Sequence, residues 1–493
     1  MKKILFTHSY FLRFDPKQWK LQQAYPPLGT LYAAAFTRNA GYEVSLFDTM
    51  FLQDAQEISP VLKSEKPDVL VIYDDGFNYL TKMCLTNMRE AAFVMIGLAK
   101  KSGIHVIVSG SDASDQSEKY LDAGADYVLA GEGEITLLEV LNSMSESGDK
   151  KSDIPGTILK SSNGIIRNKK REVVRELDTF PHPAWNLIDV KEYKSRWMKQ
   201  HGYFSLNIST TRGCPFHCNW CAKPIYGNRY NVHSPDWVVE ELKFLIATYG
   251  VSHFWMTDDI FGLKPGWIAR FAELVKREKL QFRFKIQSRV DLLLEENAIA
   301  LLAEIGCDTI WVGAESGSQK ILDAMDKGTK VEQIFTATRL MKKHGIKPAF
   351  FLQFGYPGEN ADDIQATISM VKSLMPDDIG ISVSYPLPGT KFFEKVKEEL
   401  KDKSNWTDSD ELAMMFSNTY PSSFYKVLQR YVHRTYRTRQ GITEMKNLFS
   451  SPVQISFRQL KRIAAIPVHA TGSAYYKSKL EIISGEHGLV GIN

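Results

Sequence analysis

Cysteine is scarce in this chain. There are five cysteines among 493 residues, and three of them lie within eight residues of one another. A disulfide framework uses an even number of cysteines spread over a short secreted chain, so this pattern argues against one. We therefore expect a cytoplasmic protein whose thiols stay reduced. The two isolated cysteines, Cys84 and Cys307, lie in apolar patterns and are expected to be core residues.

Long apolar runs are also missing. No window approaches the roughly 18 uninterrupted apolar residues that a membrane-spanning helix needs. The start, MKKILFTHSY, is interrupted at Thr7 and has no small-residue cleavage site after it, so it predicts a first β-strand rather than a signal peptide. The composition, 44% hydrophobic and 24% charged, is that of a globular protein. The length exceeds what one hydrophobic core usually supports and predicts two or three domains.

Short β-branched runs alternate with helical patterns through the first 140 residues. Such an alternation predicts parallel strands joined by helices, which form a doubly wound sheet. Ligands bind such sheets at the carboxyl ends of the strands, here the loops after Asp74, after Gly110 and at 131–134. The predicted strands are 3–8, 42–48, 68–73, 105–110 and 126–134.

A second series of six strand and helix repeats begins near Ser205 and fits a partial α/β barrel, shorter than the eight units of a closed one. The fold class expected is thus α/β: a doubly wound parallel sheet, then a six-strand partial barrel, then a mostly helical C-terminal region. A polar, proline-containing linker separates the first two. The domain boundaries predicted are 1–145, 146–200, 201–395 and 396–493.

The three clustered cysteines, Cys214, Cys218 and Cys221, lie in TTRGCPFHCNWC, on the loop after the first barrel strand. A structural zinc site needs four ligands, and a Cys₃His site with His217 or His233 remains an alternative. An iron–sulfur cluster fits this stretch better. Clusters normally have four cysteine ligands, so three leave one iron open to an exogenous ligand.

The Cys-x₃-Cys-x₂-Cys spacing on this loop resembles the radical S-adenosylmethionine (SAM) superfamily, and Trp220 matches the aromatic position that the family uses beside the adenine. The resemblance implies a 4Fe–4S cluster held by Cys214, Cys218 and Cys221. The open iron would chelate the amino and carboxylate groups of SAM. One electron, delivered by a donor such as flavodoxin or ferredoxin, would then cleave SAM to a 5′-deoxyadenosyl radical.

Polar residues at the ends of the later barrel strands match positions at which the family binds SAM. The resemblance implies an ammonium acceptor in the second strand, a carboxylate-binding group in the third and ribose acceptors in the fourth, with an adenine contact from GYPGE at 355–359. Each of these residues is equally able to cap the following helix. The predicted SAM-binding residues are Asp258, Asp259, Gln287, Arg289, Glu315 and Ser316.

The first domain lacks a dinucleotide fingerprint, because GEGE at 131–134 is not GxGxxG and follows the fifth strand rather than the first. Several stretches, among them VSGSD at 108–112 and LDTFPHPAWNLID at 177–189, resemble the cobalamin-binding subclass of radical SAM enzymes. This subclass contains anaerobic magnesium-protoporphyrin cyclase and many carbon methylases. Small residues at strand ends leave room for a corrin ring or its nucleotide tail. The predicted cobalamin-binding residues are Ser109, Gly110, Gly131, Glu132 and Gly133.

The chain also lacks the DxHxxG motif of other cobalamin proteins, since His8 has neither the preceding aspartate nor the following glycine. We therefore expect base-off cobalamin with no protein histidine ligand. The resemblance favours methyl transfer to an unactivated carbon of an unknown small-molecule substrate. Radical oxidation or cyclisation without methyl transfer is one alternative, and a non-catalytic cobalamin or iron–sulfur sensor is another.

Basic residues concentrate near the C-terminus. The stretch 425–479 holds eleven lysines and arginines and one acid, a net charge of +10, which leaves −6 for the rest of a chain whose total is +4. A solvated pair of basic helices accounts for this excess, and no nucleic-acid signature is present. Membrane-surface contact by 454–469 is an alternative. Aromatic residues here predict either a cover for a large, anionic or amphiphilic substrate or ordinary core packing.

Overall fold

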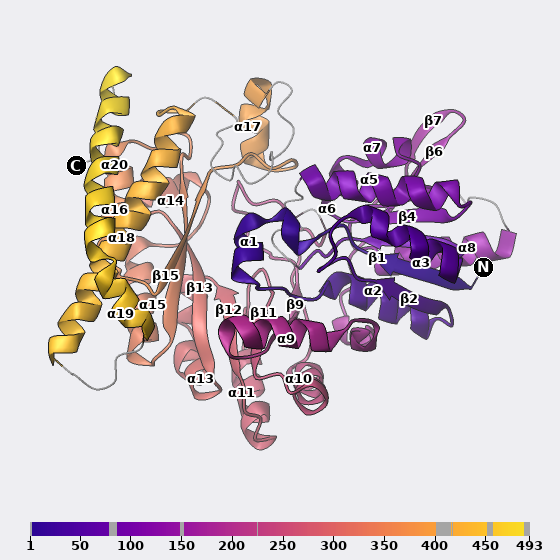
Figure 1. Ribbon diagram of the computed structural model, residues 1–493, viewed down its shortest axis with the longest axis horizontal. Helices are drawn as coiled ribbons and strands as arrows, with labels where there is room; N and C mark the ends of the chain where they lie inside the picture. The colour runs from indigo at the N-terminus through magenta and orange to yellow at the C-terminus, as the bar shows by residue number, and fades with distance from the viewer. Residues whose placement is uncertain are drawn as a thin grey trace. The chain divides into compact units, whose positions relative to one another are not determined.

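The computed structural model describes residues 2–77, 86–147, 152–223, 225–400, 416, 418–450 and 457–487 (Figure 1). Cys84 lies outside these residues. The described chain forms two compact units. The first contains residues 2–216 and 223–286, and the second contains 217–222 and the residues from 287 onward. The boundary at 286 falls inside the predicted barrel, so the first barrel strands group with the N-terminal sheet.

The N-terminal sheet has seven strands in the order β2-β1-β3-β4-β5-β6-β7. The five parallel strands predicted from the sequence are confirmed. They are β1 (Lys3–Thr7), β2 (Glu43–Phe47), β3 (Val69–Tyr73), β4 (His105–Ser109) and β5 (Tyr127–Leu129). A hairpin of β6 (Thr157–Ser161) and β7 (Gly164–Arg167) continues the sheet antiparallel to β5.

This hairpin lies in the stretch predicted as a linker, and that part of the prediction is wrong. Its signal is an Asn-Gly pair at Asn163 and Gly164 between two β-branched runs, which favours a tight turn between antiparallel strands. The helix α9 (Val190–His201) also lies in the predicted linker. Asp189 caps it by accepting from the backbone N–H of Lys191 at 3.0 Å.

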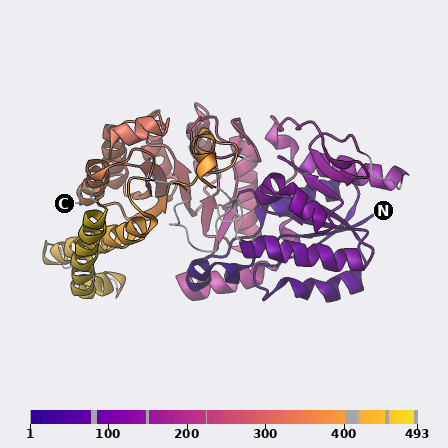
Figure 2. The same ribbon diagram turned by 90° about the horizontal axis from the view of Figure 1, so that it is seen from above.

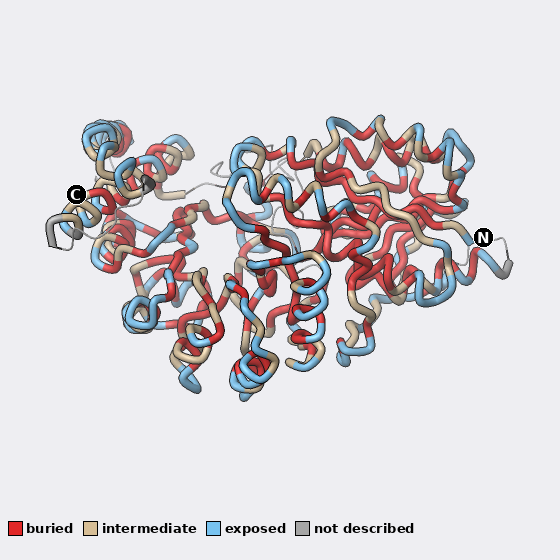
Figure 3. Tube along the Cα trace, turned by 60° about the horizontal axis from the view of Figure 1, so that its bottom comes forward, coloured by how far each residue is buried: buried red, intermediate tan, exposed pale blue. Residues whose placement is uncertain are grey.

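The central strands β1, β3, β4 and β5 are buried on both faces of the N-terminal sheet, which explains their near-continuous apolar runs. Alternate strand residues point to opposite faces. Leu5 and Leu70 join one core with α3 (Ile58–Glu65) and α5 (Thr86–Lys101). Ile4 joins the other core with α2 (Leu28–Asn39) and α8 (Glu134–Ser147). Figure 2 shows helices on both faces of this sheet, and Figure 3 colours its central strands mostly as buried.

The second sheet has six strands in the order β15-β14-β13-β12-β11-β8, so strands that follow one another in this series are neighbours. The pairings are parallel, as a partial α/β barrel requires. Within β8, β11 and β12, and within β13, β14 and β15, the carboxyl ends therefore lie on the same side, and the predicted SAM residues fall at these ends. The strands are β8 (Ser205–Ile208), β11 (His253–Met256), β12 (Arg283–Ser288), β13 (Cys307–Glu315), β14 (Lys347–Phe354) and β15 (Asp378–Val383).

Helices join successive strands of this second sheet. The first, α10, shows why they form where they do: Ser234 caps it by accepting from the N–H of Trp237 at 3.2 Å, and Gly250 ends it in a left-handed conformation. These helices are α10 (Pro235–Tyr249), α11 (Trp267–Arg277), α12 (Val290–Leu293), α13 (Ala298–Glu304), α14 (Gln319–Ala324), α15 (Val331–Lys343) and α16 (Ala361–Leu374).

The C-terminal region is helical, as predicted: α17 (Lys391–Leu400), α18 (Ser422–Ser450), α19 (Phe457–Ala464) and α20 (Ile466–Glu486). Figure 1 draws α18 and α20 side by side. The aromatic residues that the sequence offered as a substrate cover are buried in the protein, so core packing explains them. They are Phe416, Tyr420, Phe424, Tyr425, Tyr431 and Tyr436; Trp406 falls in a stretch for which no structure is described.

Part of the basic excess is paired inside the second unit. Arg462 lies 2.9 Å from Glu444, and Arg437 lies 3.4 Å from Asp378. Among the helices in the described ranges, none is long and apolar enough to cross a membrane.

Candidate cluster and cofactor site

The three clustered cysteines follow β8 and the short strand β9 (Thr211–Arg212), which pairs with β10 (Asn231–Val232). None of the three forms a disulfide. Cys214 is buried, and Cys218 and Cys221 are partly exposed. We call residues 210–222 the cysteine loop. Its front half, 210–216, belongs to the first unit and its rear half, 217–222, to the second.

A zinc site has no support in the part of the chain that the structure describes, where no three His, Cys, Asp or Glu side chains converge on one ion. The two histidines considered as a fourth zinc ligand are accounted for differently. His217 is exposed, and His233 is buried with Nδ1 3.0 Å from Asp178. A cubane cluster instead binds each thiolate through a different iron, so its ligands need not converge on one point. Three reduced cysteines with no fourth partner fit such a cluster.

Asp258, at the end of the second barrel strand, is buried and holds the front half of the cysteine loop. Its Oδ1 accepts from the backbone N–H groups of Thr210 and Thr211, each at 2.7 Å, and its Oδ2 accepts from the Thr210 hydroxyl at 2.7 Å. Burial raises the pKa of Asp258 to about 6, although these donors oppose the shift. Its predicted contact with SAM stays a prediction, as does that of its exposed neighbour Asp259.

Arg212, two residues before the first cysteine, is buried together with two carboxylates, one from the β5–α8 loop and one from the first residue of α8. Its Nη1 donates to Glu132 at 2.5 Å, and its Nη2 lies 2.9 Å from Glu134. Glu132 also accepts from the backbone N–H of Val174 at 2.6 Å. The sequence placed Glu132 at cobalamin, and in the structure its carboxylate serves the cysteine loop. The ion pair joins residues 80 positions apart, so no local pattern predicted it.

Gly213 completes the front half of the loop. Its φ is +81°, a left-handed conformation that glycine adopts without penalty, and a Cβ there would lie 2.5 Å from the carbonyl oxygen of Arg229. No other residue type fits this position without moving the backbone of the next strand. The chain from Thr210 to Cys214 is thus held at every residue before the first thiol.

Asn219 anchors the rear half of the cysteine loop, and sequence reasoning missed it. Its amide donates to the carbonyl of Ala324 at 2.7 Å, and its Oδ1 accepts from the Tyr356 hydroxyl at 2.8 Å. Its backbone N–H donates to Met325 and its carbonyl accepts from Phe392. An asparagine between two cysteines carries no metal-ligand signal. Its amide also donates to Asp326 at 3.2 Å, and a buried asparagine with partners for both its side chain and its backbone positions a loop.

Trp220 and Gln287 are both partly buried in the second unit. The buried indole Nε1 of Trp220 has no hydrogen-bond partner among the described residues. Buried donors are normally satisfied, so this one fits a bound ligand with an acceptor. The predicted place of Trp220 beside the adenine of SAM is compatible with that donor and stays a prediction.

The predicted SAM residues after the third and fourth barrel strands form hydrogen bonds and ion pairs with other residues of the second unit. Arg289 donates to Asp291 at 2.9 Å and to the carbonyl of Lys327 at 2.9 Å. Lys327 donates to Glu315 at 2.8 Å, with both side chains buried. Burial lowers the pKa of Lys327, but the charges of Glu315 and Cys218 outweigh it and the net shift is upward. Lys327, unmentioned in the sequence reasoning, is therefore a fixed positive charge near Cys218.

Glu315 and Ser316 occupy a tight turn. Glu315 has a φ of +55°, which is strained for a residue with a side chain. The hydroxyl of Ser316 lies 3.0 Å from that of Thr367. In GYPGE, the buried Glu359 accepts from the backbone N–H of Gly355 at 2.6 Å, and burial raises its pKa to about 8. Strain at a strand end and a buried carboxyl are both typical of functional sites.

Close packing and backbone conformation within the protein also explain the glycines predicted to face cobalamin. At Gly110 a Cβ would lie 3.0 Å from the Cβ of Asp74, and at Gly133 it would lie 2.8 Å from the Ser109 hydroxyl. Gly131 is in a left-handed conformation. The buried hydroxyl of Ser111 has no partner among the described residues and fits a ligand donor or acceptor. Contact of these residues with cobalamin stays a prediction.

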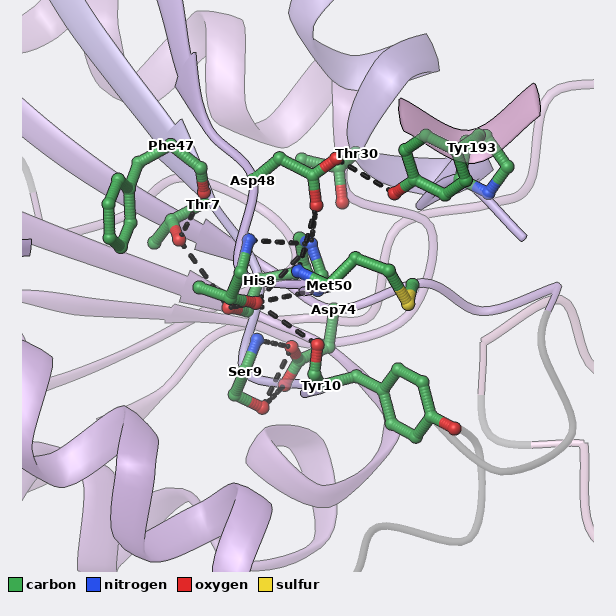
Figure 4. Close-up of polar contacts among 12 residues, drawn as sticks. Thr7, His8, Ser9, Tyr10, Thr30, Phe47, Asp48, Met50, Asp74 and Tyr193 are labelled. Carbon is green, nitrogen blue, oxygen red and sulfur yellow. Dashed lines mark hydrogen bonds and ion pairs between the residues drawn. The ribbon is translucent and has the colours of Figure 1, made fainter. Parts of the chain in front are cut away.

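His8, at the end of β1, is 1% exposed and fully used by the protein (Figure 4). Its Nε2 lies 2.9 Å from Asp48, and its Nδ1 lies 3.2 Å from the Thr49 hydroxyl. Asp48 also accepts from the Tyr193 hydroxyl at 2.8 Å. Burial raises the pKa of Asp48, but the hydrogen bonds outweigh it and hold the pKa below its usual value. Cobalt coordination would break these bonds, which supports the prediction of cobalamin without a histidine ligand.

Comparison with known proteins agrees with both halves of this architecture. A family model described as the radical SAM superfamily matches residues 208–371, and one described as the B12 binding domain matches residues 20–141. An uncharacterized methyltransferase of Pyrococcus horikoshii is 30% identical over 393 residues, covering 77% of this chain and 81% of the relative. The anaerobic magnesium-protoporphyrin IX monomethyl ester cyclase of Rubrivivax gelatinosus is 22% identical over 412 residues, covering 81% and 71%.

Among solved structures, the radical S-adenosylmethionine methyltransferase TsrM of Kitasatospora setae, with cobalamin and a [4Fe–4S] cluster bound, has a TM-score of 0.67 and 19% identity. The match covers 82% of this chain and 76% of that one, and it shows a shared fold. Fold and site together define an enzyme that combines a cluster-bearing partial barrel with a corrinoid-binding sheet. The chain belongs to the radical SAM superfamily, among the members with a B12-binding domain. Its cofactors are a 4Fe–4S cluster, SAM and cobalamin.

Proposed function

We propose that this enzyme methylates an unactivated carbon atom of a small-molecule substrate. The observation that carries the proposal is the relative that is 30% identical over most of both chains and is described as a methyltransferase. TsrM, which is described as a methyltransferase, has a similar fold, so the fold of this chain is compatible with methyl transfer. When bound, the cofactors supply a 5′-deoxyadenosyl radical, made from SAM by one electron from the cluster, and a methyl group carried by cobalamin.

We assign the residues of this chain three tasks. Cys214, Cys218 and Cys221 hold the cluster and leave one coordination position for SAM. Trp220 offers its unpartnered indole N–H to the nucleoside of SAM. Lys327 is held as a cation by Glu315 and stabilises negative charge on the neighbouring thiolate of Cys218.

The test is mass spectrometry of the product made from SAM with a deuterated methyl group. Transfer gives a product heavier by the labelled methyl group, with 5′-deoxyadenosine and S-adenosylhomocysteine formed alongside it. A product without the label, formed together with 5′-deoxyadenosine, contradicts methyl transfer.

Oxidation or cyclisation is the second candidate, because one relative is described as a protoporphyrin ester cyclase. The two candidates differ in their balance of SAM. Methyl transfer consumes one SAM for the radical and one for the methyl group, so S-adenosylhomocysteine accumulates with 5′-deoxyadenosine. Cyclisation yields 5′-deoxyadenosine alone. The ratio of these two products therefore separates the candidates before the substrate's full structure is known.

A further inference from the structure

One buried ionic cluster connects the B12-binding domain to the cysteine loop. We call it the Arg212 cluster: Arg212, Glu132 and Glu134. The exposed fractions of the three residues are 2%, 7% and 2%. Glu132 lies in the short loop between β5 and α8, Glu134 is the first residue of α8, and Arg212 ends β9, two residues before Cys214. All three lie in the first compact unit.

Aromatic rings from four separate segments surround the guanidinium. Its central carbon lies 4.3 Å from the ring centre of Phe180, 5.3 Å from Tyr32, 5.4 Å from Tyr226 and 5.7 Å from Phe77. Arginine over aromatic faces is favourable when water is excluded. These rings come from α2, the loop after β3, the segment before α9 and the chain beyond the last cysteine. The Arg212 cluster is thus the place where these segments converge.

Stability alone does not explain the Arg212 cluster. Two buried carboxylates face one guanidinium, and Glu134 Oε2 has no donor among the residues described. Taking ions out of water costs several kcal/mol each, and apolar replacements of buried ionic triads are often equally stable. A buried cluster of two carboxylates and one guanidinium is retained more readily for the geometry that it fixes than for stability.

The loop that holds Arg212 is also the loop predicted to contact cobalamin. In the sequence Gly131-Glu132-Gly133-Glu134, the two acids bind Arg212, and the two glycines are predicted to face the corrinoid. A ligand that orders this loop also orders Glu132 and Glu134. Their ion pairs carry the effect to Arg212, and the next two residues lead to Cys214. Only Gly213 separates Arg212 from Cys214, and it lies so close to the backbone at Arg229 that a Cβ there would be 2.5 Å from the Arg229 carbonyl oxygen.

We propose that Arg212 is a positioning residue that couples the cobalamin site to the cluster site, so that each cofactor changes the affinity of the protein for the other. The proposal rests on the proposed cofactor sites and is independent of the reaction catalysed. Coupling of this kind is reciprocal: if the cluster raises cobalamin affinity by some factor, cobalamin stabilises the cluster by the same factor.

The experiment measures aquacobalamin binding by absorbance titration, with the full-length protein either cluster-loaded or cluster-free. In the wild type we expect the two dissociation constants to differ by about 5-fold or more, the lower end of typical coupling. The electron paramagnetic resonance spectrum of the dithionite-reduced cluster should also change when cobalamin is added.

The informative variant is the neutral triple substitution Arg212→Met with Glu132→Gln and Glu134→Gln. It leaves no charge unpaired, whereas Arg212→Met alone strands two buried carboxylates and is expected to fold poorly. We expect the triple variant to bind both cofactors, with the ratio of the two cobalamin dissociation constants close to one and no spectral response of the cluster to cobalamin. The single variant Arg212→Lys keeps the positive charge but cannot bind both carboxylates at once. Its ratio of the two cobalamin dissociation constants should therefore lie between the wild-type value and one.

The control is Lys100→Met with Asp126→Asn, which removes a partly buried ion pair of the same unit, 2.8 Å long, between α5 and the residue just before β5. This control should be less stable than the wild type but keep the wild-type ratio of the two cobalamin dissociation constants. Equal cobalamin affinities with and without the cluster in the wild type, or a wild-type ratio in the triple variant, would overturn the proposal. Neither outcome depends on product formation, so failure of the proposed methyl transfer remains a separate result.

Discussion

The two halves of the cysteine loop are held by different kinds of chemistry. The front half is fixed by buried charges: Asp258 binds the backbone at Thr210, and Arg212 sits between two glutamates. The rear half is fixed by the neutral amide of Asn219. Charged hydrogen bonds are stronger than neutral ones but depend on protonation and on exclusion of water. We therefore expect the front half to respond more to mutation and to pH.

The largest effect should come from the thiols that the two halves present. Cys218→Ala removes a proposed cluster ligand, so nearly all bound iron and sulfide and all 5′-deoxyadenosine formation should be lost. Iron analysis and the visible absorbance of the reconstituted protein measure this. The control is Cys307→Ala in β13, a buried thiol that should be dispensable for the cluster. Normal iron content in Cys218→Ala would refute the assignment of the cysteine loop.

Asp258→Ala should be the most damaging change in the scaffold of the front half. It leaves two buried backbone N–H groups and one hydroxyl without their acceptor. Each such group costs about 1–3 kcal/mol, so the free energy of unfolding should fall by roughly 3 kcal/mol or more. Urea unfolding of the cluster-free protein measures this loss. Asp258→Asn keeps one acceptor oxygen and should lose about half as much; equal losses would argue against the hydrogen bonds as the cause.

The pH response should come from His233, whose backbone N–H donates to Thr210 O at 2.9 Å. Burial lowers the pKa of His233 from 6.5 to about 4, so the unfolded chain binds a proton that the folded protein does not take up until about pH 4. The contribution of His233 to stability should therefore fall between about pH 6.5 and pH 4, by about 3 kcal/mol at most, while the raised pKa of Asp258 gives an opposite contribution below about pH 6. Urea unfolding of the cluster-free protein across this range tests it. His233→Gln should remove that part of the slope, and substitution of the exposed His217 should leave it unchanged.

The smallest effects should come from the rear half. Tyr356→Phe removes one hydrogen bond to Asn219 and should cost about 1 kcal/mol, while Asn219→Ala removes that bond together with the bond from the Asn219 amide to the Ala324 carbonyl and should cost about 2 kcal/mol. Neither cost should vary strongly between pH 4 and pH 7, because these groups are neutral and the one carboxylate near the amide, Asp326 at 3.2 Å, is half-exposed. Unfolding curves of both variants at the two pH values measure this. A strong pH dependence in the Asn219 variant would remove the contrast between the halves.

The sequence predicted the parts of this molecule that local patterns encode. Alternating β-branched runs predicted both sheets, and the spacing of Cys214, Cys218 and Cys221 predicted the cluster loop. It did not reveal the ion pair of Arg212 with Glu132 and Glu134, because partners so far apart along the chain leave no periodic signal. Asn219 and Lys327 were missed because a single amide or lysine has no fixed spacing to a partner. The β6–β7 hairpin was missed although its Asn-Gly turn was readable.

Gly213 has a practical consequence for protein engineering. The motif Cys-x₃-Cys-x₂-Cys is short enough to graft onto another barrel, but its first cysteine follows a glycine that lies against the backbone at Gly227 and Arg229. A graft that carries only the thiols would meet a host strand of different shape at this point. The transplantable unit therefore runs from residue 209 to residue 232, and a successful chimera would have to import both strands of that small ribbon.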